Sequence, residues 1–171
     1  SNDAGVDALH GLMMRKPRAD HRFTLQHFGM SSPEVVRRLA RLGGVASVNP
    51  YYVYYRSEFN APYLGSDRAF TAARLRTLVD AGVPTAMHSD TPVGPPRPLE
   101  MVWIAVNRFG LSGQVRGPEE RVSVYEAMRM VTIDAAFSVG AEDKVGSIAA
   151  GKLADFAVLE QDPFTVPKEN I

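Results

Sequence analysis

The sequence contains no cysteine. This absence excludes disulfides and thiolate metal sites, and it leaves open a metal site built from histidine and carboxylate side chains. Neither sign of charge is in excess, because 19 Lys and Arg residues balance 19 Asp and Glu residues. A chain without net charge or a basic stripe gives no support for binding to nucleic acid or to an anionic membrane surface.

Long apolar runs are also absent. No stretch of about 18 consecutive apolar residues occurs, so the sequence predicts no membrane span. No signal peptide is visible, and we expect a cytoplasmic protein. The 171 residues are enough for one hydrophobic core. They are too few for a complete eight-stranded α/β barrel, which typically needs about 250 residues.

Two common catalytic motifs are missing as well. The sequence has no Gly-x-Gly-x-x-Gly or Walker-type loop that would cradle phosphates. It has no Gly-x-Ser-x-Gly elbow, and without cysteine a thiol nucleophile is excluded. Nucleophilic serine or cysteine catalysis therefore has no support.

What the sequence does contain is an alternation of helix-like and strand-like segments, which is typical of parallel α/β architecture. Ser31, Pro33 and Glu34 predict a capped helix start, and Ser123 with Glu126 predicts a second capping box. The tyrosine-rich residues 50–66 are expected to form a long loop. Apolar spacing predicts strands over residues 22–28, 45–48 and 84–89, and helices near residues 6–13, 31–42, 70–79, 99–109 and 123–130.

The character of the chain changes after Gly140. Residues 145–148 and 156–159 are short apolar runs on either side of a turn containing Gly151, which predicts two short strands. We therefore divide the chain into residues 1–140, an α/β part, and residues 141–171, a β tail.

Two residues at the ends of predicted strands could carry chemistry, because parallel barrels place their active sites at the carboxyl ends of the strands. His27 ends the first strand and Asp90 follows the third. Taken singly, each has an ordinary explanation: a hydrogen-bonded imidazole, or a turn aspartate before Pro92. Together, at the same end of neighbouring strands, a His nitrogen and a carboxylate could share one cation.

The neighbours of this pair are less specific. His88 lies two residues before Asp90, so both point to the same face of an extended strand. We favour a supporting role for His88 beside the metal ligands over simple filling of the interior. Several aromatic residues follow a strand end and could line a substrate pocket, with Tyr51, Tyr54 and Tyr55 as the first candidates and Tyr52, Phe59 and Tyr63 beside them. A loop packed by its own side chains explains these tyrosines equally well.

Three stretches of the sequence resemble the amidohydrolase superfamily, in particular the branch called amidohydrolase family 3. Arg22–His27 resembles the family's sixth barrel strand, which ends in a metal-binding His. The stretch His88-Ser-Asp-Thr-Pro-Val93 resembles the end of the eighth strand. The third stretch, Val145–Leu159, contains Gly-Ser-Ile and Gly-Lys-Leu-Ala-Asp and resembles the family's C-terminal strands. This last motif is the most specific of the three.

The resemblance implies a fold: the C-terminal part of a (β/α)8 TIM-type barrel, with strands six to eight in residues 1–140. It implies that residues 141–171 are a short β tail belonging to a small β-sandwich shared with the N-terminus. Residues 1–4 resemble the loop just past the fifth strand. The family's other ligands, namely the His-x-His pair, the His of the fifth strand and a bridging group, are absent from this sequence.

The resemblance also implies a chemistry. His27 and Asp90 would bind a divalent metal, Zn²⁺, with one or two ions in the intact enzyme. Asp90 would take the proton of the attacking water during hydrolysis of an amide or other C–N bond in a small-molecule substrate, and would pass it to the leaving nitrogen. The isolated chain is expected to be inactive. A non-catalytic scaffold or assembly module with a vestigial site is the alternative, and retention of metal discriminates between the two.

Three strands of a barrel would leave open edges and an apolar inner face, for which Val45 and Val48 are the candidates. Such surfaces recruit partners. We therefore expect a homo-oligomer or association with the missing N-terminal half.

Overall fold

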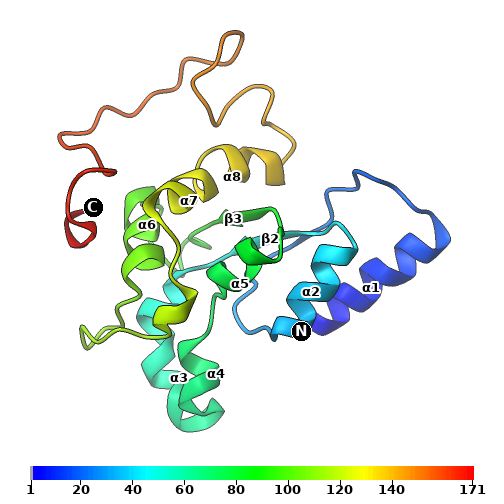
Figure 1. Cartoon of the computed structure of the whole chain (residues 1–171), viewed down its shortest axis with the longest axis horizontal. Helices are drawn as coiled ribbons and strands as arrows, with labels where there is room; N and C mark the ends of the chain where they lie inside the picture. Colours follow the sequence, from blue (N-terminus) through cyan, green and yellow to red (C-terminus); the bar gives the residue numbers. More distant parts are fainter. Residues whose placement is uncertain (1) are drawn as a thin grey trace.

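A three-stranded parallel sheet lies at the centre of the structure, a computed structural model that describes residues 2–171 (Figure 1). The strands are β1 (Thr24–Leu25), β2 (Val45–Val48) and β3 (Thr85–Met87), in the spatial order β1-β2-β3. Both neighbouring pairs are parallel. Parallel neighbours require crossover connections, so the predicted α/β class is confirmed. β1 is much shorter than the strand expected over residues 22–28.

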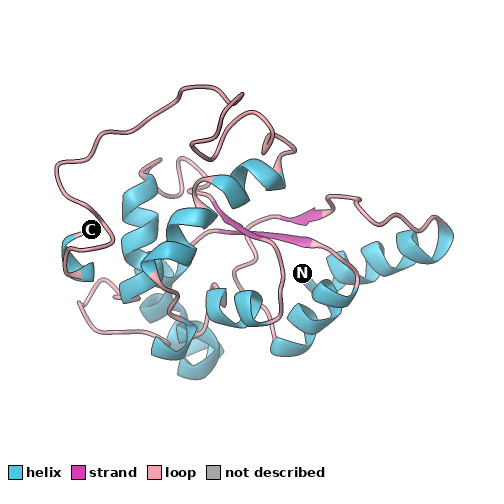
Figure 2. Ribbon diagram, turned by 45° about the horizontal axis from the view of Figure 1, so that its top comes forward, coloured by secondary structure: helices cyan, strands magenta, loops and turns pink. Residues whose placement is uncertain are grey.

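Helices make the crossovers and surround the sheet. α2 connects β1 to β2, and the segments from η1 to α5 connect β2 to β3. α5 and α8 both contact β3, and the sheet lies between α8 on one side and α2 with α5 on the other (Figures 1 and 2). The helices are α1 (Asn2–Arg15), α2 (Pro33–Arg41), the π-helical η1 (Tyr52–Arg56), α3 (Ser57–Leu64), α4 (Ser66–Phe70), α5 (Leu75–Asp80), α6 (Pro98–Asn107), the 3-10 helix η2 (Pro118–Glu120), α7 (Val124–Met130), α8 (Ile133–Ser138) and the 3-10 helix η3 (Lys168–Asn170).

Two helix starts show how local sequence sets an element. Ser123 and Glu126 form the predicted capping box of α7. α2 begins one residue later than expected, because Ser32 and not Ser31 is the N-cap and accepts a hydrogen bond from the Val35 N–H. Glu34 instead pairs with arginines on the surface of α2.

Several other expectations were wrong. Most of residues 50–66 is helical rather than a loop, with η1 and α3 covering residues 52–64. Val53 and Ser57, four residues apart, are both buried and anchor one helical face. The single helix expected over residues 70–79 is broken between α4 and α5. Residues 2–4 belong to α1 and not to a loop, and Ser1 lies outside the described residues. α8 was not expected.

The C-terminal tail does not form the two expected strands. Residues 145–159 have no regular strand structure, and Lys152 holds the turn together by donating hydrogen bonds to the Val145 carbonyl and the Ser147 hydroxyl. A strand needs a neighbour to accept and donate its backbone hydrogen bonds. No strand of the described residues pairs with this segment.

The two faces of the sheet differ in chemistry. Ala46 and Val48 belong to the main hydrophobic core. Ser47, Ala86 and His88 instead line a cavity of about 640 Å³ that is covered in part by α8. Val45 and Val48 are both buried, so the expectation that they line an open inner face was wrong. No helix among residues 2–171 is long and apolar enough to cross a membrane.

Candidate metal centre

His27 and Asp90 meet at the carboxyl ends of the strands. His27 lies two residues beyond β1, and Asp90 lies three residues beyond β3. The His27 Nε2 is 3.2 Å from the Asp90 Oδ2, and the two side chains are 49% and 35% exposed. The structure therefore brings the two sequence-predicted ligands together at an accessible position. Their role as ligands stays a prediction.

The backbone that carries this pair has unusual conformations. His27, Phe28 and Asp90 all have positive φ angles, of 68°, 30° and 54°. Left-handed backbone costs a residue with a side chain roughly 1–2 kcal/mol. Such conformations persist only where surrounding contacts hold them.

One of the contacts that hold this backbone comes from Asn49, directly after β2. Its backbone N–H donates to the His27 carbonyl at 3.1 Å, and its Nδ2 donates to the Ser89 carbonyl at 3.3 Å. The Asn49 Oδ1 accepts from the Tyr51 N–H at 3.0 Å, and the whole residue is buried. Asn49 therefore links the segment that carries His27 to the one that carries Asp90. Its position at a strand end was the only sequence signal of this role.

His88 lies beside the pair. Its ring centroid is 5.2 Å from that of His27, at an angle of 62°. Its Nε2 is buried and has no hydrogen-bond partner among the described residues. Burial, followed by the nearby His27, lowers the pKa of His88, which favours the neutral imidazole. A neutral imidazole with a free nitrogen is the form that binds a metal or orients one of its ligands.

The three tyrosines proposed for a substrate pocket do not line the cleft beside His27. Tyr51 is buried, its hydroxyl donates to the Pro95 carbonyl at 3.0 Å, and burial raises its pKa to about 12. Tyr54 packs edge-on against Trp103. Tyr55 stacks on Tyr51 with 5.6 Å between ring centroids. The segment is helical, which places these side chains outside the cleft beside His27, and their role in a substrate pocket stays a prediction.

A different face of the same helical segment forms the cleft. Tyr52, Arg56 and Asn60, spaced four residues apart, line a cleft of about 590 Å³ together with His27 and Gly29. A Cβ on Gly29 would lie 2.5 Å from the Tyr52 ring, so the close approach of this tyrosine requires glycine there. Burial, and then the charge of Asp90, raises the pKa of Tyr52. Tyr52 was one of several tyrosines that the sequence offered for a pocket, whereas Arg56 and Asn60 were missed, and the helical spacing of the three residues was the signal that could have found them.

The donor atoms fit part of a zinc site. An imidazole nitrogen and a carboxylate oxygen are both zinc ligands, and the free Nε2 of His88 is nearby. Residues 2–171 contain no group of three or more His, Cys, Asp or Glu side chains that could hold a metal ion by itself. Zinc normally takes three or four protein ligands. A zinc site built on His27 and Asp90 would therefore need further protein ligands to be complete.

These observations define a class of protein. It is the parallel α/β proteins in which an imidazole and a carboxylate meet at the carboxyl ends of the strands. Comparison with known proteins is more specific. The sequence model described as "Amidohydrolase family" matches residues 2–171, so the chain belongs to this family.

The curated relatives agree with this family. The chain is 34% identical over 162 residues to the N-substituted formamide deformylase of Arthrobacter pascens, covering 94% of this chain and 30% of the relative. It is 32% identical to the putative amidohydrolase YtcJ of Bacillus subtilis, covering 92% of this chain and 30% of the relative. The chain thus spans less than a third of the length of these relatives.

Solved structures show the same likeness. An uncharacterized metal-dependent hydrolase from Pyrococcus furiosus matches with a TM-score of 0.75 and 27% identity, over 93% of this chain and 32% of that one. Atrazine chlorohydrolase TrzN from Arthrobacter aurescens, complexed with zinc, matches with a TM-score of 0.54 and 22% identity, over 87% and 31%. The second match supports the fold alone.

Proposed function

We propose that this chain is the C-terminal segment of a barrel-type amidohydrolase and that the complete protein hydrolyses an amide or related C–N bond of a small molecule. The observation that carries the proposal is the approach of His27 Nε2 to Asp90 Oδ2, 3.2 Å apart at the ends of two parallel strands. The family match and the name of the formamide deformylase support this class of substrate.

His27 and Asp90 would hold a divalent ion, which we propose to be zinc, and His88 would support them from beside. A bound zinc ion supplies a water molecule whose pKa is lowered to about 7. Asp90 would accept a proton from the water that attacks the carbonyl carbon, and would return that proton to the leaving nitrogen as the C–N bond breaks. A carboxylate suits both steps because it accepts and donates a proton while its second oxygen remains an acceptor.

A first test removes the proton acceptor and the ligand separately in the complete protein. Asp90→Asn keeps the shape of the side chain but cannot accept a proton at neutral pH, so kcat should fall by roughly 10²- to 10⁴-fold with metal still bound. His27→Asn should instead weaken zinc affinity, and excess Zn²⁺ should restore part of its activity. His10→Asn, at an exposed position of α1, is the matched control.

Two results would contradict the proposal. Near-normal kcat in a metal-loaded Asp90→Asn variant would make Asp90 a turn residue. A wild-type protein that retains no divalent metal on metal analysis would favour the non-catalytic scaffold with a vestigial site.

A further test uses the 171-residue chain alone. Two donors cannot enclose an ion that normally takes three or four protein ligands, so we expect no measurable metal-dependent hydrolysis from the purified chain. Turnover by the pure chain that is lost on adding a chelator would refute the assignment of an incomplete site.

A further inference from the structure

The segment that follows His27 is held by residues far away in the sequence. The Ala73 N–H donates to the Gly29 carbonyl at 2.8 Å, and the Arg74 Nε donates to the Ser31 carbonyl at 2.9 Å. Both donors lie in the break between α4 and α5. The segment from His27 to Ser31 is therefore attached to this break by two hydrogen bonds.

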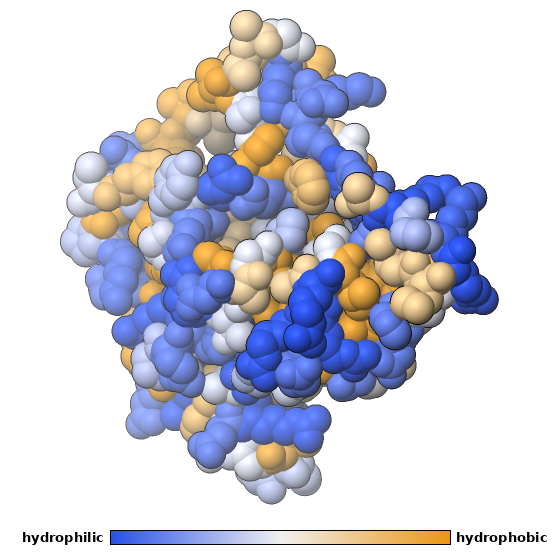
Figure 3. All heavy atoms as spheres, turned by 45° about the vertical axis from the view of Figure 1, so that its right-hand side comes forward, coloured by the Kyte–Doolittle hydropathy of each residue, from blue (hydrophilic) through white to orange (hydrophobic). Residues whose placement is uncertain are grey.

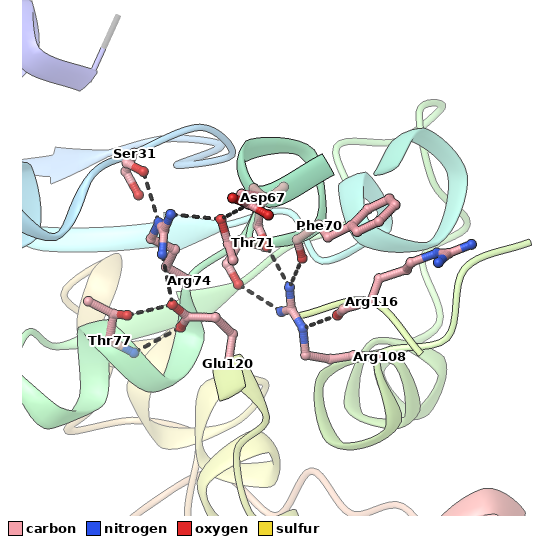
Figure 4. Close-up of polar contacts among 11 residues, drawn as sticks. Ser31, Asp67, Phe70, Thr71, Arg74, Thr77, Arg108, Arg116 and Glu120 are labelled. Atoms are coloured by element: carbon pink, nitrogen blue, oxygen red, sulfur yellow. Dashed lines mark hydrogen bonds and ion pairs between the residues drawn. The ribbon is translucent and has the colours of Figure 1, made fainter. Parts of the chain in front are cut away.

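Arg74 is itself fixed by a buried carboxylate. Its Nη1 contacts the Glu120 Oε1 at 3.2 Å, and its Nη2 donates to the Thr71 hydroxyl at 2.7 Å (Figure 4). Glu120 is buried and also accepts hydrogen bonds from the Thr77 N–H at 3.0 Å and the Thr77 hydroxyl at 2.5 Å. All three nitrogens of the guanidinium thus have separate acceptors, one of which is the backbone of the His27 segment.

The buried Arg108 also holds the break between α4 and α5 in place. The fully buried Arg108 donates to the carbonyls of Phe70, Ala72 and Ala73 at 2.9, 2.8 and 3.0 Å (Figure 4). Burial lowers the pKa of Arg108 to about 10, so the side chain remains charged at neutral pH. Ala73, with a φ of 51°, is therefore held through its carbonyl by Arg108 and through its N–H by Gly29.

The hydrogen bonds from Ala73 and Arg74 lie next to a stretch of backbone with an unfavourable conformation. His27 and Phe28 have consecutive positive φ angles, and such residues relax to ordinary backbone unless their surroundings prevent it. The orientation of the His27 imidazole depends on this conformation. The Arg74 guanidinium connects the segment from His27 to Ser31 to the buried Glu120. Arg108 holds the neighbouring Ala73 carbonyl.

We propose that Arg74, held by Glu120, is a positioning residue that sets the orientation of His27 as a metal ligand. The inference rests on the proposed function of His27. Arg74 acts only through the Ser31 carbonyl and the neighbouring backbone, and it does not contact the reacting atoms.

The first test measures the positioning without metal, by hydrogen exchange of the 171-residue chain followed by NMR. Arg74→Lys keeps the charge beside Glu120 but cannot also reach Ser31 and Thr71. Exchange of the Ala73 and Asn49 N–H groups, which bond Gly29 and His27, should become about tenfold faster relative to the Ala46 N–H of β2.

Two further variants keep this test decisive. The double variant Arg74→Met with Glu120→Gln removes both charges, so no unpaired buried carboxylate remains, and it should show the same local change. Arg37→Met, which breaks an exposed pair with Glu34 on α2, should change none of the three amides relative to one another. Equal acceleration of all amides, or no acceleration, in the Arg74 variants would overturn the inference.

The second test measures zinc affinity and kinetics in the complete protein. Supporting residues of metal ligands typically contribute about 10- to 100-fold to metal affinity. Arg74→Lys should therefore weaken zinc binding by about tenfold and lower kcat at limiting zinc, with KM little changed and activity partly restored by excess zinc. If His27→Asn loses zinc and Arg74→Lys does not, only this inference fails. If neither loses zinc, the proposed function fails.

Discussion

At the scale of single residues, the candidate site depends on a few buried polar groups, and Asn49 is the clearest case. Its backbone N–H, its Nδ2 and its Oδ1 each have a partner. Its backbone bond could form with almost any residue there. Its side-chain bonds, to Ser89 and Tyr51, require an amide.

This requirement predicts a specific cost for Asn49→Asp. The substitution places an oxygen opposite the Ser89 carbonyl in a buried position, so unfolding in urea should show a loss of roughly 1–3 kcal/mol. Asn60→Asp, the same change in the open cleft, is the control and should stay within about 0.5 kcal/mol of wild type. Equal stability of Asn49→Asp and wild type would show that the link to Ser89 contributes nothing.

A second residue-scale prediction separates packing from substrate binding. Tyr51→Phe removes a buried hydroxyl that donates to the Pro95 carbonyl, and should lower the free energy of unfolding by about 1 kcal/mol. Tyr63→Phe, at an exposed position, should change it by less than about 0.5 kcal/mol. A raised KM in the complete protein with unchanged stability of Tyr51→Phe would instead support the predicted role of Tyr51 in a substrate pocket.

At the scale of elements, α7 is fixed by electrostatics as well as by its cap. Glu126 closes the capping box and pairs with Arg76 of α5 at 2.7 Å. The hydrogen bond from Arg76, and then those from Ser123, lower the pKa of Glu126 to about 2. One carboxylate thus stabilises the start of α7 and its contact with α5.

The lowered pKa predicts a pH dependence of stability. Because the folded pKa lies below the ordinary value of 4.5, the contribution is complete above about pH 4.5 and is lost as the pH falls toward 2. After allowance for solvent screening we expect roughly 1–2 kcal/mol. The difference in unfolding free energy between wild type and Glu126→Gln should shrink between pH 5 and pH 3. A constant difference would contradict this account. Glu160→Gln, in the exposed tail, serves as the charge control.

Elements determined by local sequence were predictable, and those determined by distant contacts were not. The cap of α7 and the apolar strand β2 needed only neighbouring residues. The break between α4 and α5 depends on Arg108, which binds carbonyls 35 to 38 residues away in the sequence. No periodicity in residues 70–79 carries that information.

The same distinction applies to the site. The approach of His27 and Asp90 was predictable because carboxyl ends of parallel strands meet at one edge of a sheet. Tyr52 could not be singled out among the tyrosines, because its place in the cleft beside Arg56 and Asn60 follows only if residues 52–64 are helical. A loop assignment gave the tyrosines no defined direction, so the choice among them could not be made.

At the scale of the whole molecule, the chain forms a core but leaves strand edges and apolar side chains exposed. No further strand pairs with β1 or β3 among residues 2–171, so each presents an open edge. Apolar side chains of the tail are exposed, Ile148 by 87% and Val158 by 97%. Figure 3 shows apolar residues lying between hydrophilic ones on one face of the molecule. Open edges and exposed apolar segments favour association.

These surfaces predict that the 171-residue chain does not remain a simple monomer. In light scattering its apparent mass should exceed the 18.7 kDa of one chain and rise with concentration. The double variant Ile148→Ser with Val158→Ser should lower that mass at each concentration, because it removes two of the most exposed apolar side chains. Leu111→Ser, at an exposed apolar position in the loop after α6, is the matched control and should leave the apparent mass unchanged. A concentration-independent monomer would contradict the expectation that the open edges and tail recruit a partner, and it would weaken the case for an interrupted barrel.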